Sequence, residues 1–266
     1  MPGDRRVTLK SLGQIDKMAV AGRLVSDVLD RLGSELKPGM TTLELDRIAE
    51  EMIRGAGGIP SFIGVPGRLA PYRHSLCISI DDEIVHGVPG PRRIRDGQLV
   101  SIDAGAIVDG WHGDAARTFI VGAVPERVRE LVSATERAMY AGIAAAVPGN
   151  HLSDISGAIE DVAREDGYGV IRAFVGHGIG TEMHEEPQVT NYRTGTKGRL
   201  IEPGLCLAIE PMFTLGSYGV RIREDGWTVV TADGTLAAHW EHTIAVLPDG
   251  PHILTRNLGI ATADAA

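Results

Sequence analysis

A pattern of two helices followed by strands occurs twice in this chain, and this internal repeat limits the fold more than any other feature. Each copy has a long amphipathic segment that ends at a Pro-Gly pair, Pro38-Gly39 in the first and Pro148-Gly149 in the second. At this offset of 110 residues Leu45 aligns with Ile155. Chance similarity of two amphipathic helix pairs is the alternative. A true repeat predicts two halves packed about a pseudo-twofold axis, with a site between them.

The expected elements alternate between helical and strand-like patterns without a linker. Helices are expected at 15–36, from 42 to about 55, at 125–147 and around 155–162, and Thr41 with Glu44 forms a capping box before the second. Short apolar runs predict strands at Leu76–Ile80, Leu99–Val108, His112–Val121, Leu205–Phe213 and Trp240–Leu247. The chain is therefore expected to be one α/β domain over residues 10–250, with halves at 10–124 and 125–250, a short extension at 1–9 and a tail at 251–266.

Charge and composition exclude several classes of protein. The net charge of −9 argues against direct nucleic-acid binding. Only two cysteines, Cys77 and Cys206, are present, which fits a reducing compartment. The chain starts without an apolar leader, and its longest small-apolar run, Ala141–Val147, is too short for a membrane span. A cytoplasmic protein that does not bind membranes is expected.

The strands at 99–121 carry the first candidate site. Asp109-Gly110 is a strong two-residue hairpin signal. With Val108 opposite Trp111, Asp103 faces Ala116 and shares a strand face with Asp114 as a diagonal neighbour, within reach of a common ion. A bulge would change this register, and a solvent-facing acid pair is the alternative interpretation.

Further candidate ligands lie in apolar or glycine-rich contexts. Glu210 and Glu241 follow or interrupt strand-like runs, and His177 stands between glycines that let the backbone approach closely. The glycines near His177 also resemble a dinucleotide-binding loop, but no ribose-binding acid follows in a βαβ unit. Four carboxylates and one imidazole form an oxygen-rich set that favours divalent cations, and two such ions can activate water for hydrolysis.

Several motifs, taken in order, make the chain resemble the type I methionine aminopeptidases over roughly residues 10 to 250. They are Val85-His86-Gly87, Ser101-Ile102-Asp103, His112-Gly113-Asp114, Gly176-His177-Gly178, His184-Glu185-Glu186-Pro187, Ile209-Glu210-Pro211 and Glu241-His242-Thr243. The resemblance implies the pita-bread fold, an α/β (α+β) fold of two pseudo-symmetric halves with a central antiparallel sheet flanked by helices. It also implies a metal-dependent enzyme that removes the initiator methionine when the second residue is small, using water activated by two divalent ions (Co, Mn, Fe or Zn).

The resemblance also implies roles for single residues. Two metal ions would be bound by Asp103, Asp114, His177, Glu210 and Glu241, of which Asp114 and Glu241 would bridge them. His86 and His184 would contact the substrate and stabilise the tetrahedral intermediate, and Glu210 would also shuttle a proton. The methionine side chain would be bound by Tyr72, Cys77, Met183 and Trp227.

The chain departs from the family pattern at the pocket wall. The segment Gly64–Tyr72 is longer than usual, and Met183 stands where an aromatic residue is common. An Xaa-Pro aminopeptidase or dipeptidase of the same fold, or a binding protein without catalysis, are the alternatives. The expected partners are N-termini of nascent polypeptides, with transient ribosome proximity, and the expected state is a monomer. Because the chain begins Met1-Pro2, its own mature form is expected to start at Pro2.

Overall fold

The computed structural model describes residues 7–256. Its helices are α1 (Leu12–Glu35), α2 (Thr42–Gly55), α3 (Glu126–Ala145) and α4 (Leu152–Asp166). The strands are β1 (Ile59–Pro60), β2 (Leu76–Ile80), β3 (Glu83–Val85), β4 (Gln98–Val108), β5 (Trp111–Val121), β6 (Gly169–Val170), β7 (Gly176–Gly178), β8 (Glu185–Val189), β9 (Cys206–Ile209), β10 (Met212–Thr214), β11 (Val220–Ile222), β12 (Val229–Thr231), β13 (Ala237–His239), β14 (Glu241–Leu247) and β15 (Gly250–Ile253). The predicted cleavage after Met1 and residues 257–266 of the expected tail lie outside the described residues.

One large antiparallel sheet joins the two sequence repeats. Its strand order is β1-β4-β5-β14-β9-β7-β8, with β2 also paired to β4 and β15 to β14. The pairing of β5 with β14 connects the first half of the chain to the second. Two small sheets, β13-β10-β6 and β11-β12-β3, lie beside it. The predicted α/β class, with a central antiparallel sheet flanked by helices, is confirmed.

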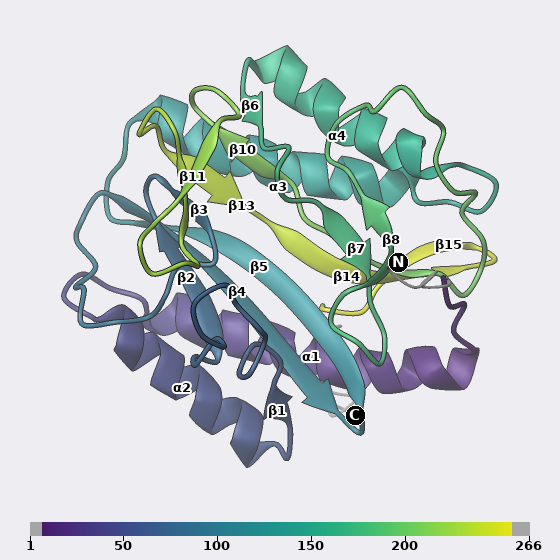
Figure 1. Ribbon diagram of the computed structural model, residues 1–266, viewed down its shortest axis with the longest axis horizontal. Coiled ribbons are helices and arrows are strands. Elements are labelled where there is room, and N and C mark those ends of the chain that lie inside the picture. The colour runs from purple at the N-terminus through teal and green to yellow at the C-terminus, as the bar shows by residue number, and fades with distance from the viewer. Residues whose placement is uncertain (1–6, 257–266) are drawn as a thin grey trace, which may run out of the picture.

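Both helix pairs pack on the same face of the large sheet. Ile102 and Ala104 of β4 contact the core formed with α1 and α2. Leu207 of β9 and Ile244 of β14 contact the core formed with α3 and α4. In Figure 1 the first helix pair lies in the lower part of the view and the second pair in the upper part. Because side chains alternate along a strand, the residues between these positions point to the opposite face.

Local signals account for the helix ends. The capping box predicted at Thr41 is present, since its hydroxyl accepts from the Glu44 amide while the Glu44 carboxylate accepts from the Thr41 amide. Gly167 ends α4 in the left-handed conformation, with φ of 72°. In the described part of the chain, we find no helix with the length and apolarity that crossing a membrane requires.

The predicted β4–β5 register is confirmed, whereas the predicted strand at Leu205–Phe213 is interrupted. Val108 pairs with Trp111 and Asp103 with Ala116, without a bulge. The second segment instead divides into β9 and β10, which belong to different sheets. Pro211 lies at the break because it has no amide hydrogen for a ladder. The sheet also continues through β15, past the expected domain limit at residue 250.

Candidate metal centre and substrate pocket

Strand register brings the acidic residues of the first half beside one from the second. Ala116 of β5 pairs with Asp103 on one side and with Glu241 on the other. Asp114 lies two residues before Ala116 on the same strand and so points to the same face. Residues directly opposite in a sheet share a face. Asp103, Asp114 and Glu241 therefore lie together on the face away from the helices.

The same face receives its remaining ligand candidates from β7 and β9. Ala208 of β9 pairs with His177 on one side and with Thr243 on the other. Glu210 follows two residues after Ala208, and Glu241 precedes Thr243 by two residues, so both share this face. Alternation along five neighbouring strands thus places the whole predicted ligand set on one surface.

Distances confirm that these side chains converge. One ligand atom each from Asp114, His177 and Glu241 lie within 4.8 Å of one another. His177 Nε2 is 3.5 Å from Glu210 Oε1 and 3.9 Å from Asp114 Oδ2. The hydroxyl of Thr243 donates to the Asp114 carbonyl and accepts from its amide, which fixes the backbone of this residue.

The buried carboxylates of this cluster repel one another unless a cation or protons neutralise them. Burial, reinforced by neighbouring carboxylates, raises the pKa values of Asp114, Glu210 and Glu241 well above their ordinary range. Burial likewise raises the pKa of Asp103. Like charges confined in a low-dielectric site favour protonation or binding of a cation.

His177 is oriented to offer a lone pair to this cluster. Its Nδ1 is 2.9 Å from the Gly178 carbonyl oxygen, which as an acceptor fixes the hydrogen on that nitrogen. Burial lowers the pKa of His177 to about 3, so the ring is neutral. Nε2 therefore faces the carboxylates with its lone pair, as a metal ligand does.

Orphaned oxygen atoms show that the donor set fits divalent cations. Asp103 Oδ1, Asp114 Oδ1 and Glu241 Oε1 are buried and have no hydrogen-bond partner within residues 7–256. Buried polar atoms are normally satisfied, and unpaired ones cost free energy. Carboxylate oxygens with one imidazole are ligands that hard or borderline divalent metals accept.

A pocket of about 130 Å³ opens beside the acidic cluster, and every predicted site residue lines it. Its apolar wall includes the predicted Tyr72, Cys77, Met183 and Trp227. Tyr72 and Trp227 meet edge to face, with ring centroids 4.9 Å apart. Cys77 of β2 lies directly opposite Asp103, so β4 joins the apolar wall to the acidic cluster.

His86 and His184 lie at the polar side of this pocket. The ring of His86 packs edge to face on Phe174, and the ring of His184 packs on His177 with centroids 4.4 Å apart. Burial lowers the pKa of His86 to about 4, so its imidazole is neutral near pH 7. Neutral imidazoles can donate one hydrogen bond each to a substrate.

Sequence reasoning missed three residues of this site. Phe62 and Val65 line the apolar wall. Buried His239 places its Nε2 3.8 Å from Glu210 Oε2 and 4.0 Å from Glu241 Oε2. The signals available were the apolar residues beside and within the lengthened Gly64–Tyr72 segment and the closely spaced histidines around Glu241.

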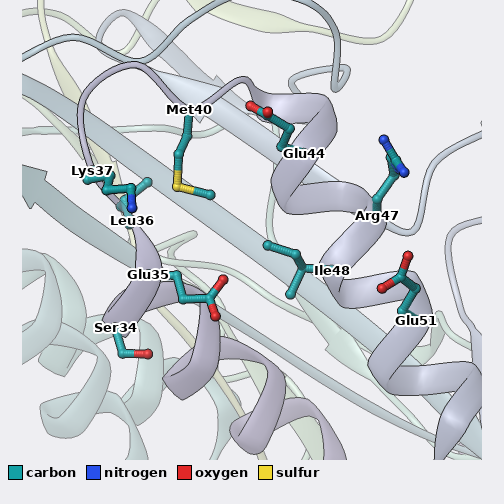
Figure 2. Close-up of a pocket in the computed structure, with 9 residues that line it drawn as sticks. All are labelled: Ser34, Glu35, Leu36, Lys37, Met40, Glu44, Arg47, Ile48 and Glu51. Atoms are coloured by element: carbon teal, nitrogen blue, oxygen red, sulfur yellow. The ribbon is translucent and has the colours of Figure 1, made fainter.

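A larger hollow between α1 and α2 lacks comparable chemistry. It measures about 730 Å³ and lies at the end of α1 and the start of α2, where Figure 2 shows Glu35, Glu44, Arg47 and Glu51 among its lining side chains. Acidic and basic groups alternate there. Among the described residues, the one group of potential metal ligands is the Asp114 cluster.

Comparisons with known proteins agree with this geometry. The model of metallopeptidase family M24 matches residues 16–248. A methionine aminopeptidase of Clostridium perfringens is 47% identical over 249 residues, which cover 94% of this chain and 98% of that protein. The crystal structure of methionine aminopeptidase from Rickettsia prowazekii superposes with a TM-score of 0.91 at 35% identity, covering 94% of this chain and 100% of that one.

More distant pita-bread proteins share the fold alone. A prolidase from Pyrococcus furiosus superposes with a TM-score of 0.76 at 23% identity, and this chain covers 65% of its length. The identity and the coverage are both higher for the methionine aminopeptidases. This chain therefore belongs to metallopeptidase family M24 and, within it, to the type I methionine aminopeptidases with the pita-bread fold.

Proposed function

We propose that this protein removes the N-terminal methionine from polypeptides whose second residue is small, with two divalent ions held by Asp103, Asp114, His177, Glu210 and Glu241. One observation carries the proposal: strand register places four carboxylates and one neutral imidazole on the same face, directly beside an apolar pocket. Bound divalent ions would supply Lewis acidity and an activated water.

The side chains around the ions divide the remaining work. Glu210 has a raised pKa and can carry a proton between the attacking water and the leaving amine. His86 and His184 can donate hydrogen bonds to the substrate amide and carbonyl, where charge develops during hydrolysis. Asp114 and Glu241 would contact both ions, as the family resemblance implies, and one oxygen of each lies within 4.8 Å of the other and of a His177 nitrogen.

The apolar wall supports selection of methionine. Tyr72, Cys77, Met183 and Trp227, together with Phe62, enclose a narrow cavity suited to an unbranched thioether. A large or charged second residue would lie next to the cluster and would meet steric and desolvation penalties.

The proposal extends to the setting of the reaction. We propose that the protein is a cytoplasmic monomer that meets nascent chains near the ribosome. Its net charge of −9 disfavours direct contact with RNA, so the nascent chain itself would bring it there. Light scattering in solution tests whether the protein is a monomer. Co-sedimentation with ribosomes that carry or lack nascent chains tests whether the nascent chain recruits it.

A peptide panel tests the reaction. Protein loaded separately with Co, Mn, Fe or Zn is offered Met-Ala-Ser, Met-Leu-Ser and Ala-Pro-Ser, and free amino acids are quantified. Rapid release of methionine from Met-Ala-Ser, with little turnover of the other two peptides, is expected. Preferred cleavage of Ala-Pro-Ser would favour an Xaa-Pro peptidase, and no turnover with any metal would favour a binding protein.

A further inference from the structure

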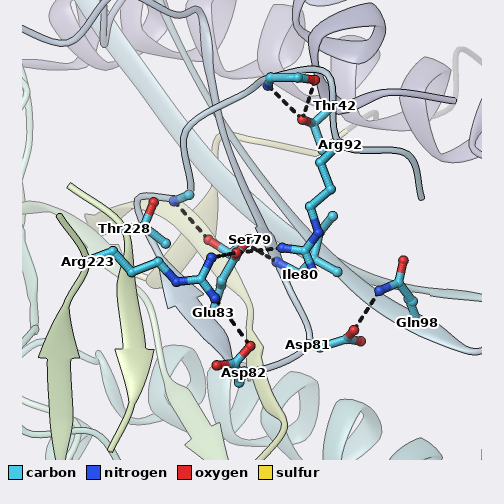
Figure 3. Close-up of polar contacts among 12 residues, drawn as sticks. Thr42, Ser79, Ile80, Asp81, Asp82, Glu83, Arg92, Gln98, Arg223 and Thr228 are labelled. Carbon is cyan, nitrogen blue, oxygen red and sulfur yellow. Dashed lines mark hydrogen bonds and ion pairs between the residues drawn. The ribbon is translucent and has the colours of Figure 1, made fainter. Parts of the chain in front are cut away.

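An ion-pair network centred on the buried carboxylate of Glu83 connects the two sides of the substrate pocket. Glu83 on β3 is 6% exposed, and its Oε1 accepts hydrogen bonds of 2.6 Å from both Arg92 and Arg223. Its Oε2 accepts from the Ile80 amide at 2.8 Å. Figure 3 shows the two guanidinium groups approaching this carboxylate from different segments of the chain. Asp82 adds a second acidic partner for Arg223, at 3.6 Å.

Arg223 begins the turn that presents Trp227 to the pocket. The turn joins β11 to β12, and the Arg223 amide donates to the Thr228 carbonyl at 2.8 Å. Within it, the Asp225 carboxylate accepts hydrogen bonds from the Trp227 and Thr228 amides. The indole then packs against the ring of Tyr72 and lines the pocket.

The strands alone hold this β11–β12 hairpin weakly. β12 pairs with β3 at two residue pairs, Val229–Val85 and Val230–Glu83, with a register shift between them, and one further backbone hydrogen bond runs from the Thr231 amide to the Asp82 carbonyl at 2.9 Å. β11 forms the outer edge, and Ile222 is 58% exposed. On the other side, β3 leads directly into His86. A contact between Arg223 and Glu83 therefore ties the wall that carries Trp227 to the strand that carries His86.

We propose that the Arg223–Glu83 ion pair positions Trp227 and thereby sets the affinity of the pocket for the methionine side chain. Only the effect on KM rests on the proposed function; the positioning of Trp227 does not. Arg223 is a positioning residue, because it acts through the hairpin and is absent from the pocket lining. Removing it leaves Glu83 with Arg92 and the Ile80 amide, so the buried carboxylate keeps partners and the fold is retained.

Arg92 provides a matched control. It donates to the same oxygen at the same distance of 2.6 Å and is 39% exposed, against 42% for Arg223. Its segment, however, contacts the start of α2, where the Thr42 amide donates to the Arg92 carbonyl, and carries no pocket aromatic. If each arginine contributed only to stability through its ion pair with Glu83, substituting Arg223 or Arg92 would have the same effect on KM.

The experiment compares wild type, Arg223→Ala, Arg223→Lys and Arg92→Ala in the metal-loaded form, using Met-Ala-Ser. Arg223→Ala is expected to raise KM about tenfold with kcat changed less than about twofold, as expected when ground-state and transition-state binding are lost equally. Arg223→Lys should recover part of this loss, and Arg92→Ala should leave KM within about twofold of wild type. Equal KM increases in the two alanine variants, or an unchanged KM in Arg223→Ala, would overturn the proposal.

Hydrogen exchange supplies a readout that does not depend on activity. In the metal-free proteins, peptides covering residues 218–231 should exchange faster in Arg223→Ala than in Arg92→Ala or wild type. Unchanged exchange there would contradict the positioning role. A wild-type protein that fails to hydrolyse Met-Ala-Ser would refute the proposed function, while the exchange experiment would still decide the role of Arg223.

Discussion

At the scale of single residues, the unpaired carboxylate oxygens are the strongest sign of chemistry. Asp103 Oδ1 and Asp114 Oδ1 are both buried without partners in the described structure. An isosteric amide keeps the volume but removes one negative charge from the set. We therefore expect Asp103→Asn and Asp114→Asn each to lower kcat by at least about 10²-fold while the protein stays folded. Asp109→Asn, in the exposed turn of the same hairpin, is the control, and near-normal turnover by either metal-saturated variant would refute the ligand assignment.

Substitutions of His177 and His184, whose rings meet edge to face, should have different effects. His184→Ala is expected to lower kcat about 10²–10³-fold with bound metal retained, because it removes a donor to the developing charge. His177→Ala removes the neutral nitrogen that faces Glu210 and Asp114, so metal content should fall. Elemental analysis of the purified variants, alongside kinetics, separates these results. Loss of metal from His184→Ala would make this residue a ligand.

Metal binding should release protons. Burial raises the pKa values of Asp114, Glu210 and Glu241, so the metal-free fold retains protons there at pH values where free carboxyl groups are ionised. A cation has to displace these protons, and its affinity should therefore fall as the pH is lowered. Calorimetric titration of metal-free protein with Mn²⁺, in buffers of different ionisation enthalpy, measures the release directly. Binding that is independent of pH and releases no protons would contradict the account.

The sequence predicted part of this site for a local reason. The Asp109-Gly110 turn sets the register of β4 and β5, and the register makes Asp103 and Asp114 diagonal neighbours. No local pattern states that Glu241 pairs beside Ala116, since that depends on strands more than a hundred residues apart. The predicted place of Glu241 beside the two aspartates therefore came from the family resemblance. His239 was missed because the break at Trp240 separates it from β14.

At the scale of elements, close contact between α1 and β5 depends on glycine. A Cβ atom added at Gly113 would lie 2.6 Å from the Gly22 nitrogen and 2.8 Å from the Ala21 carbonyl carbon, both of them backbone atoms. Figure 1 shows α1 running alongside the sheet. These helix backbone atoms cannot move aside as a flexible side chain would. The close approach of α1 to β5 therefore requires a residue without a Cβ atom at position 113.

Gly113→Ala should consequently lower the free energy of unfolding by about 1–3 kcal/mol through overpacking. Gly13→Ala on α1 is the matched control, because an added Cβ meets nothing within 4 Å there. That change should raise stability by up to about 1 kcal/mol, since glycine is unfavourable within helices. Urea denaturation of both proteins measures the difference, and equal stabilities would show that the helix can move away.

Element boundaries were predictable where capping or turn residues mark them, and less so where strands change sheets. The helix start after Thr41 and the hairpin turn at Asp109 follow from side-chain and backbone preferences of a few residues. The split between β9 and β10 needed tertiary pairing as well as Pro211. Short strands such as β3, β11 and β12 were not predicted from the sequence, because three residues are too few to show an alternating pattern.

At the scale of the whole molecule, the fold is a sheet with one face for packing and one for chemistry. Both helix pairs cover the first face, and residues from both halves of the chain meet on the second. The pairing of β5 with β14 joins the halves directly at the cluster. The sequence repeat thus predicted two helix pairs and a site between the halves, although the division at residues 124 and 125 stays a prediction.

The central claim is that the five predicted side chains hold two divalent ions, and an anomalous difference map from a crystal of the Mn²⁺-loaded protein tests it most directly. Two anomalous peaks are expected in direct contact with these side chains, with Asp114 and Glu241 between them. Asp103, His177 and Glu210 should complete the two sets. Mn²⁺ bound elsewhere, or a fully loaded crystal with no peak among these residues, would contradict it.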